Sequence, residues 1–240
     1  YAGLNNDFMD QLSKNPLVSI VVITYNSEKY VLETLESIKA QKYPNIELIV
    51  SDDCSTDKTV ELCKSWIEAN NRRFNCAKII TSHVNTGIAP NCNRGLKNAS
   101  GEWIKFIAGD DKLEDYLIEE YINKTNSEAE IKCIYSNVRI YKNIFKEDNL
   151  LPIIKMNDLI FNSAEIKANE QFRILLRLNP VWTSTLFIKK ELLDLVGGFN
   201  EKYPFFEDRP LLISLTKLGF KIHYLDIFGA KYRRRSSSIQ

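Results

Sequence analysis

Residues that bind zinc or form disulfides are scarce in this sequence of 240 residues. It has two histidines, and its five cysteines include no Cys-x-x-Cys pair. Structural zinc sites need several Cys or His ligands at close spacings, and a disulfide framework needs paired cysteines. The sequence therefore argues against both. Scattered thiols of this kind are typical of a reduced protein, and we expect a cytoplasmic location.

Long hydrophobic runs and a strong net charge are also absent. No apolar run approaches the roughly 20 residues of a membrane helix, and the formal net charge is +1. Such a chain has no general attraction to nucleic acid, so no nucleic-acid partner is expected. Peripheral association with the inner face of the membrane and the oligomeric state stay open. Since 44% of the residues are hydrophobic, the chain can build one sizeable core.

Short β-branched runs alternate with helical patterns through the first half. The run at 18–25 reads Val-Ser-Ile-Val-Val-Ile-Thr-Tyr, which is typical of a buried parallel strand. After it, Val31, Leu35 and Ile38 have helical spacing. The alternation predicts a mostly parallel sheet with right-handed crossovers. Further strands are expected at about 46–51, 78–82, 102–108 and 133–141, and helices at about 27–43, 57–67, 90–99 and 117–122.

The pattern weakens in the second half. Residues 142–169 have no sustained periodicity, and we expect either a mobile excursion over a site or a partner surface. Residues 231–235 contain three consecutive arginines and are expected to form a basic tail, which is either solvated or closes over a pyrophosphate. The other expected elements are helices at 172–178, at 190–196 and from about 208, and strands at 184–188 and 221–225.

Adjacent carboxylates follow two of the expected strands. Asp52 and Asp53 come after the second strand, and Asp110 and Asp111 come after the fourth. The carboxyl ends of parallel strands share one edge of a sheet, so both pairs are expected to face a common crevice. One carboxylate there can bind a base or ribose, and another can hold a metal against phosphates. For Gly-Asp-Asp taken alone, a turn that caps the next helix is the more common interpretation.

A third acidic pair, Glu207 and Asp208, precedes a helical pattern. Carboxylates at a helix N-terminus interact favourably with the helix dipole, so capping is the simpler interpretation. A carboxylate fixed in this way can also act as a general base toward a sugar hydroxyl. Trp182 is expected either to stack on a sugar ring or, more commonly for such a residue, to pack in the core.

Six motifs taken together resemble glycosyltransferase family 2. They occur in the family's order and cover about residue 16 to the end of the chain, which makes the combination specific although each motif alone is weak. The motifs are Val-Ser-Ile-Val-Val-Ile-Thr-Tyr-Asn at 18–26, Ser-Asp-Asp-Cys-Ser-Thr-Asp at 51–57, Asn85-Thr86-Gly87 with Asn93-Arg94-Gly95, Gly101-Glu102 leading to Asp110-Asp111, Gly197-Gly198-Phe199-Asn200-Glu201, and Glu207-Asp208.

The resemblance implies an α/β protein with the GT-A fold: a Rossmann-like, mostly parallel central sheet flanked by helices, with a smaller acceptor-side subregion. After an N-terminal extension at 1–15, one domain is expected over 16–240. Its nucleotide-sugar-binding half would cover about 16–111, and its acceptor-binding half, which carries the catalytic base, about 112–240.

The implied activity is an inverting sugar transfer from a nucleoside diphosphate sugar, with a UDP-sugar favoured, to a hydroxyl of a glycan or lipid-linked saccharide. Manganese or magnesium would be the cofactor, and the product a bacterial-type surface polysaccharide or a related glycan. An inactive or weakly active nucleotide-sugar-binding module is the alternative.

The family's functional residues carry over position by position. Thr24 and Tyr25 would lie beside the base, with Asp53 on the uracil edge and Asp52 next to it. Asn26 and Gly87 would also belong to the residues that bind the donor. Asp110 would contact the ribose or the metal, and Asp111 would be the principal metal ligand. Asp208 would be the general base, supported by Glu207.

Three positions depart from the family pattern. Ala108 stands where the metal motif often has Asp, so fewer carboxylates are present for a cation. Cys54 replaces a common Gly in the donor loop, and Arg235 stands near a position where many members carry His. The last change puts a metal contact from the end of the chain in doubt.

Overall fold

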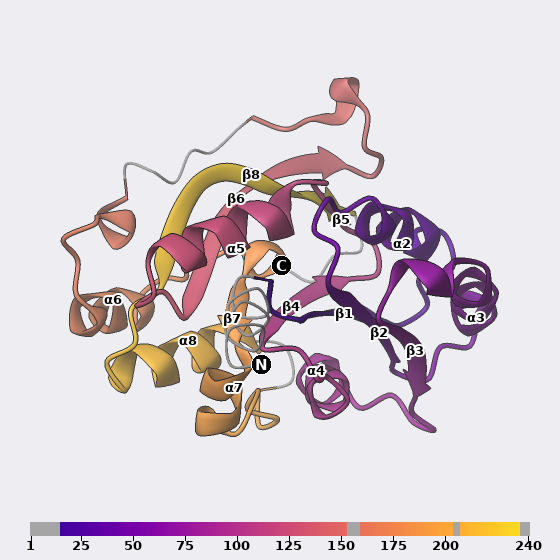
Figure 1. The fold of residues 1–240 in the computed structure, drawn as a ribbon, viewed down its shortest axis with the longest axis horizontal. Coiled ribbons are helices and arrows are strands. Elements are labelled where there is room, and N and C mark those ends of the chain that lie inside the picture. Colours follow the sequence, from indigo (N-terminus) through magenta and orange to yellow (C-terminus); the bar gives the residue numbers. More distant parts are fainter. Residues whose placement is uncertain (1–14, 153–158, 204–206, 236–240) are drawn as a thin grey trace, which may run out of the picture.

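A mixed eight-stranded sheet forms the centre of the protein in the computed structural model (Figure 1). The structure describes residues 15–152, 159–203 and 207–235, so the expected N-terminal extension at 1–15 lies almost wholly outside the described residues. The strand order is β3-β2-β1-β4-β7-β6-β8-β5. Within the described part of the chain, no helix is long and apolar enough to cross a membrane.

The first four strands confirm the predicted parallel half of the sheet. They are β1 (Val18–Thr24), β2 (Ile46–Asp52), β3 (Cys76–Thr81) and β4 (Trp103–Ala108). Thr24 pairs with Asp52, and Ile23 pairs with Ala108. The carboxyl ends of β1, β2 and β4 are therefore level with one another. The loops that follow these strands, with their acidic pairs, leave from the same edge.

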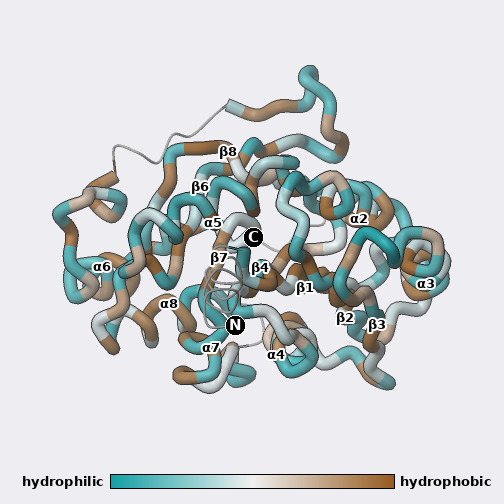
Figure 2. Tube along the Cα trace, in the orientation of Figure 1, coloured by the Kyte–Doolittle hydropathy of each residue, from teal (hydrophilic) through white to brown (hydrophobic). Residues whose placement is uncertain are grey.

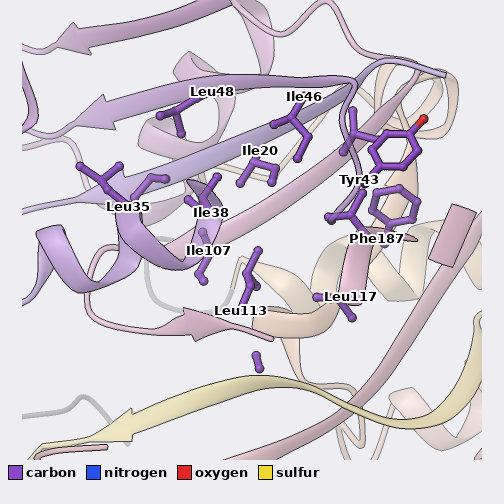
Figure 3. Close-up of a cluster of buried hydrophobic side chains, with 14 of the residues drawn as sticks. Ile20, Leu35, Ile38, Tyr43, Ile46, Leu48, Ile107, Leu113, Leu117 and Phe187 are labelled. Carbon is purple, nitrogen blue, oxygen red and sulfur yellow. The ribbon is translucent and has the colours of Figure 1, made fainter. Parts of the chain in front are cut away.

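Helices cover both faces of this parallel half. Helices α2 (Val31–Lys39) and α3 (Thr59–Asn70) lie on one face, and α4 (Ile88–Lys97) lies on the other (Figure 1). Figure 3 shows Leu35 and Ile38 of α2 in the same buried cluster as Ile20 and Leu48 of the sheet. In Figure 2 the trace around β1 and β2 is largely hydrophobic, whereas hydrophilic segments lie mostly at the periphery.

The close approach of α4 to the sheet depends on a glycine. A Cβ atom at Gly95 would lie 2.3 Å from Cγ1 of Val21, so no larger residue fits without movement of the helix. Helix α4 begins at Ile88, directly after Gly87 with its φ of +92°. Pro90, expected at the first helical position, lies two residues further in. Proline has no N–H, and an N–H at this position of the first turn would have no partner within the helix, so proline is tolerated there.

The second half extends the sheet with antiparallel and parallel pairs. Strand β7 (Phe187–Lys189) pairs antiparallel with β4 and with β6 (Cys133–Lys142), and β8 (His223–Arg234) runs parallel to β6. The flanking helices are α5 (Leu117–Ser127), α6 (Ala168–Leu175), α7 (Lys190–Val196) and α8 (Asp208–Lys217). The short 3-10 helices are η1 (Asn71–Arg73), η2 (Glu147–Asn149), η3 (Ile160–Asn162) and η4 (Thr183–Thr185).

The largest correction to the sequence interpretation concerns the end of the chain. The expected short strand at 221–225 and the basic tail at 231–235 are in fact one strand, β8, which continues to Arg234. Two register shifts between β6 and β8 interrupt the alternation of side chains. A Cβ at Gly229 would lie 2.4 Å from Oγ of Ser136, so the strands approach closely there. Bulges and glycine hide such a strand from a search for period-two patterns.

Two smaller differences concern short elements. The expected strand at 184–188 begins as the 3-10 turn η4, and only its end enters β7. Strand β5 (Lys112–Leu113), which pairs antiparallel with β8, was not predicted. In the unpatterned region 142–169, Phe161 is 1% exposed and packs against Tyr135 with a ring-centroid distance of 6.5 Å. That part of the region therefore belongs to the core.

Candidate active site

Asp53, at the end of β2, organises the loop that precedes α4. Its Oδ2 accepts hydrogen bonds from the main-chain N–H groups of Thr86 (2.8 Å) and Gly87 (2.7 Å). Its Oδ1 accepts from Oγ1 of Thr86 (2.6 Å) and Nη2 of Arg94 (3.1 Å). The side chain is thus buried with about four acceptor positions in use, which is the capacity of a carboxylate. Asp53 shapes this loop, and its expected contact with a uracil edge stays a prediction.

Asp52 fixes the loop that directly follows β2 in a similar way. It is fully buried, and its Oδ2 accepts from Oγ1 of Thr24 (2.8 Å) and from Oγ of Ser55 (2.5 Å). Cys54, which lies in this loop just before Ser55, has a φ of +68°, a left-handed conformation that favours glycine. Cys54 therefore has the backbone conformation that glycine, the common residue at this position of the family, adopts readily.

The loop after β1 presents an aromatic side chain to solvent. Tyr25 is 50% exposed, and the neighbouring Asn26 has a φ of +48°. Oδ1 of Asn26 accepts a hydrogen bond from the main-chain N–H of Thr56 (2.9 Å), which joins this loop to the one after β2. Two loops at the carboxyl edge of the sheet are therefore fixed to each other, and an open aromatic ring lies beside them.

Asp110 and Asp111 follow β4 at the same edge. The turn is tied to β1 by a hydrogen bond of 2.9 Å from the N–H of Gly109 to the carbonyl of Ile23. Asp111 is 2% exposed, whereas the side chain of Asp110 is 16% exposed. Burial and the charge of Asp110 raise the pKa of Asp111 well above its usual range, and burial raises the pKa of Asp110. Of the two, Asp110 is the one that a ligand in solution can reach.

The end of β8 neutralises this acidic pair. The main-chain N–H of Arg233 donates to Oδ1 of Asp111 (2.8 Å), and Nε of Arg233 donates to the carbonyl of Asp110 (2.8 Å). Nε of Arg235 lies 3.0 Å from Oδ2 of Asp110. The charges of Arg235 and Arg233 oppose the rise in the pKa of Asp110. The predicted alternatives for the arginine run, a solvated tail or closure over a pyrophosphate, did not include this contact.

A buried lysine lies behind the pair. Lys105 on β4 has no exposed surface, and its Nζ donates to the carbonyl of Phe106 (2.5 Å). Burial lowers its pKa to about 7, and the charge of Asp111 opposes this shift. Lys105 falls within the strand expected at about 102–108, and no function was predicted for it. A charged residue inside an otherwise apolar strand was the available signal.

Asp208 begins helix α8 and is held by three donors. Its Oδ2 accepts from Nδ2 of Asn179 (2.8 Å) and from Oγ1 of Thr183 (2.6 Å), and its Oδ1 accepts from the N–H of Arg209 (2.6 Å). These three hydrogen bonds fix the orientation of the carboxylate. The side chain is partly exposed. Asn179 and Thr183, which fix its orientation, were not identified from the sequence.

Glu207 differs from its neighbour in environment. Burial raises its pKa to about 7, and the charge of Asp208 adds to the shift. Burial and the charge of Glu207 in turn raise the pKa of the Cys92 thiol on α4. The charge of Glu207 therefore acts on a residue of α4, the helix whose Arg94 contacts Asp53.

A second set of contacts connects Asp208 to the pair after β4. Trp182 precedes Thr183 in the chain and packs against Tyr232, with ring centroids 5.8 Å apart. Tyr232 lies next to Arg233 on β8, and burial followed by the charges of Asp111 and Asp110 raises the pKa of its hydroxyl. Trp182 therefore packs against the protein, as the more common interpretation expected. The structure joins Thr24, Asp52, Asp53 and Gly87 by direct contacts. Asp208 is linked to Asp110 and Asp111 through Thr183, Trp182 and Tyr232.

The carboxylates present are a poor fit to a divalent metal. Oδ1 of Asp111 is occupied by a main-chain donor, Asp110 is paired with Arg235, and the exposed position 108 carries alanine. Across residues 15–152, 159–203 and 207–235, no three His, Cys, Asp or Glu side chains come together to hold a metal. The assignment of Asp111 and Asp110 as ligands of manganese or magnesium stays a prediction.

Solved structures share this architecture. S. aureus TarS 1-349 in complex with UDP has a TM-score of 0.72 and 24% sequence identity, with 91% of this chain and 60% of that chain covered. A mannosyltransferase from Pyrobaculum calidifontis, PcManGT, in complex with GDP-Man and Mn2+, has a TM-score of 0.67 and 18% identity, with 92% and 57% covered. The fold is the GT-A fold of these neighbours.

The sequence model of Glycosyl transferase family 2 matches residues 19–191, and the chain belongs to this family. Glycosyltransferase GlyG of Streptococcus pneumoniae serotype 4 is 29% identical over 231 residues, which are 93% of this chain and 72% of that protein. An uncharacterized glycosyltransferase of Haemophilus influenzae is 29% identical over 222 residues, with 91% and 65% covered. The chain thus spans about two thirds of the length of these relatives.

Proposed function

We propose that the protein transfers a sugar from a nucleoside diphosphate sugar to an acceptor hydroxyl, with inversion at the anomeric carbon and Asp208 as the general base. The observation that carries the proposal is the environment of Asp208. Three donors hold its carboxylate at the start of α8, and a chain of packed residues leads from it to the acidic pair after β4. Its partial exposure leaves the carboxylate open to a substrate.

The donor is expected at the carboxyl edge of β1, β2 and β4, where open α/β sheets bind their ligands. TarS is described with UDP and with UDP-GlcNAc, and the Pyrobaculum enzyme with GDP-Man, so a nucleoside diphosphate sugar is the donor class. We favour UDP. The exposed ring of Tyr25 offers an aromatic surface for a base, and the loops fixed by Asp52 and Asp53 would form the rest of its pocket.

In this proposal residues 16–240 form one catalytic domain. The donor half is 16–111, and the half from 112 onward supplies Asp208 and the acceptor surface. The acceptor class, a glycan or lipid-linked saccharide, rests on the family resemblance. The product, a surface polysaccharide or related glycan, has the same basis, whereas the cytoplasmic location rests on the scattered thiols.

The reaction is a single displacement. Asp208 accepts the proton of the acceptor hydroxyl while that oxygen forms a bond to the anomeric carbon, and the bond from this carbon to the diphosphate oxygen breaks on the opposite face. Asn179 and Thr183 keep the carboxylate oriented during the transfer. Asp208 carries a negative charge before the step and none after it, so a charged Glu207 beside it would destabilise the starting state. The pKa of Glu207, raised to about 7, leaves about half of the molecules with this residue protonated near pH 7.

Manganese or magnesium, expected from the resemblance, enters none of these steps. A divalent cation would neutralise charge on the departing diphosphate in a site that holds one. The carboxylates described above fit such an ion poorly, so the proposed reaction is limited to what the chain's own residues do.

The Asp208→Asn variant tests the proposal. We expect release of nucleoside diphosphate from a nucleotide sugar, with water as the acceptor, to fall by at least about a hundredfold, the lower range for loss of a general base. UDP affinity should stay within about twofold of wild type because the substitution is nearly isosteric. Asp115→Asn is the matched control, since Asp115 is an exposed carboxylate paired with Lys42. Turnover close to wild type in Asp208→Asn would remove Asp208 from the role of base.

A further inference from the structure

The guanidinium of Arg235 lies across the ends of two neighbouring parallel strands. Its Nε is 3.0 Å from Oδ2 of Asp110, which follows β4. Its carbon Cζ is 5.8 Å from the ring centroid of Tyr30, in the loop that follows β1. This is the edge where open α/β sheets bind phosphate groups. A fixed positive charge therefore lies where the proposed donor would place its diphosphate.

Strand β8 ends directly before Arg235, and Arg233 anchors this end of the strand. The side chain of Arg233 is 1% exposed, and its guanidinium lies between the rings of Phe145 (4.0 Å) and Tyr30 (4.3 Å). Its Nη2 is 3.2 Å from Oε2 of Glu33. Arg235 lies on the same side as Arg233, since both guanidinium groups lie near the ring of Tyr30, whereas Arg234 is exposed.

We propose that Arg235 is the cation that binds the donor diphosphate, so that nucleotide binding does not require a divalent metal. This inference rests on the proposed function. A guanidinium stays charged at all relevant pH values and binds phosphate oxygens through two parallel hydrogen bonds. With 37% of its side chain exposed, Arg235 can meet a ligand from solution. Asp110 orients this guanidinium and is occupied by it.

The alternative is a metal that displaces Arg235 from Asp110. Such a metal would compete with a charged partner already in place, and it would find the neighbouring oxygen of Asp111 taken by the N–H of Arg233. Ala108, exposed at the end of β4, supplies no oxygen ligand from its side chain. The nearby side chains thus favour the guanidinium over a cation that needs several oxygen ligands.

UDP binding by isothermal titration calorimetry, in excess EDTA and in excess Mn2+, tests the inference. We expect wild-type affinities within about threefold of each other in the two conditions. Arg235→Ala should weaken binding in EDTA by about tenfold or more, as expected when a charged hydrogen-bond donor is lost. Arg235→Lys should restore part of the loss. Arg234→Ala, the exposed neighbour on the other face of the strand, is the control and should change affinity by less than about twofold.

The outcomes separate this inference from the proposed function. UDP binding by wild type only in Mn2+ would overturn the inference and leave the glycosyltransferase proposal standing. Unchanged binding of Arg235→Ala in EDTA would also overturn it. If neither UDP nor GDP bound in either condition, the proposed donor class would fail, and the inference with it. Thermal unfolding of each variant checks that an affinity change does not come from loss of the fold.

Discussion

The main-chain N–H of Arg233 donates a 2.8 Å hydrogen bond to Oδ1 of Asp111, although 122 positions separate the two residues in the sequence. The bond fixes the end of β8 to the turn after β4. In Figure 1 this end of β8 lies beside β5 and close to α2. The environment of the acidic pair therefore depends on the last described strand as much as on the strand that carries it.

Replacing Arg233 should destabilise the fold. Arg233→Ala removes two stacking contacts and the charged donors that face the carbonyls of Asp110 and Asn143, and it leaves a cavity. We expect a loss of about 2 to 4 kcal/mol in the free energy of unfolding, measured with urea. Arg234→Ala, an exposed site, should change stability by less than about 0.5 kcal/mol. Equal effects of the two substitutions would contradict the anchoring role of Arg233.

The left-handed backbone at Cys54 gives a second prediction. A side chain with a Cβ is strained at a φ of +68°, by roughly 1 kcal/mol relative to glycine. Cys54→Gly should therefore be more stable than Cys54→Ala by about that amount, less the entropy that glycine gains in the unfolded chain. Urea unfolding of both variants isolates the effect of the Cβ, because neither has the thiol. An Ala variant as stable as the Gly variant would show that the position carries no strain.

Glu207 predicts a pH dependence of stability. Its pKa is about 7 in the folded protein and about 4.5 in the unfolded chain, so the folded state binds more protons between these values. Stability should fall as pH rises through this window, because the unfolded state releases its proton first. From about pH 5 to pH 8 we expect the free energy of unfolding of wild type to fall by about 2 kcal/mol relative to that of Glu207→Gln, which cannot ionise. The difference between the two urea unfolding curves at each pH measures the effect, and a constant difference would exclude a raised pKa.

The first half of the fold was predictable because its signals are local. Buried parallel strands such as β1 are dense in β-branched residues, and helices such as α2 show three-to-four spacing of apolar residues. The placement of Asp52 and Asp53 beside the loop after β1 also follows from the alternation alone, since parallel strands align their carboxyl ends. Those expectations are confirmed by the register of the sheet.

The remainder depends on contacts between distant segments. Nothing in the local pattern of 231–235 shows that Arg233 would be buried, because three consecutive arginines resemble a solvated tail. Asn179 and Thr183, which bind Asp208, lie 29 and 25 positions before it, in the short connection between the helix expected at 172–178 and the strand expected at 184–188. Such residues are identified by three-dimensional proximity. The roles of Asp53, Asp111 and Asp208 in binding and catalysis stay predictions.

The anomeric configuration of the first sugar released from an α-linked donor tests the central claim most directly. A panel of UDP-sugars and GDP-mannose would be incubated with the protein without acceptor, and proton NMR would record the sugar before it equilibrates in water. The account predicts slow hydrolysis of at least one donor, with the β anomer appearing first and with loss of turnover in Asp208→Asn. Release of the α anomer first, or tight binding of a donor with no turnover at all, would contradict the account.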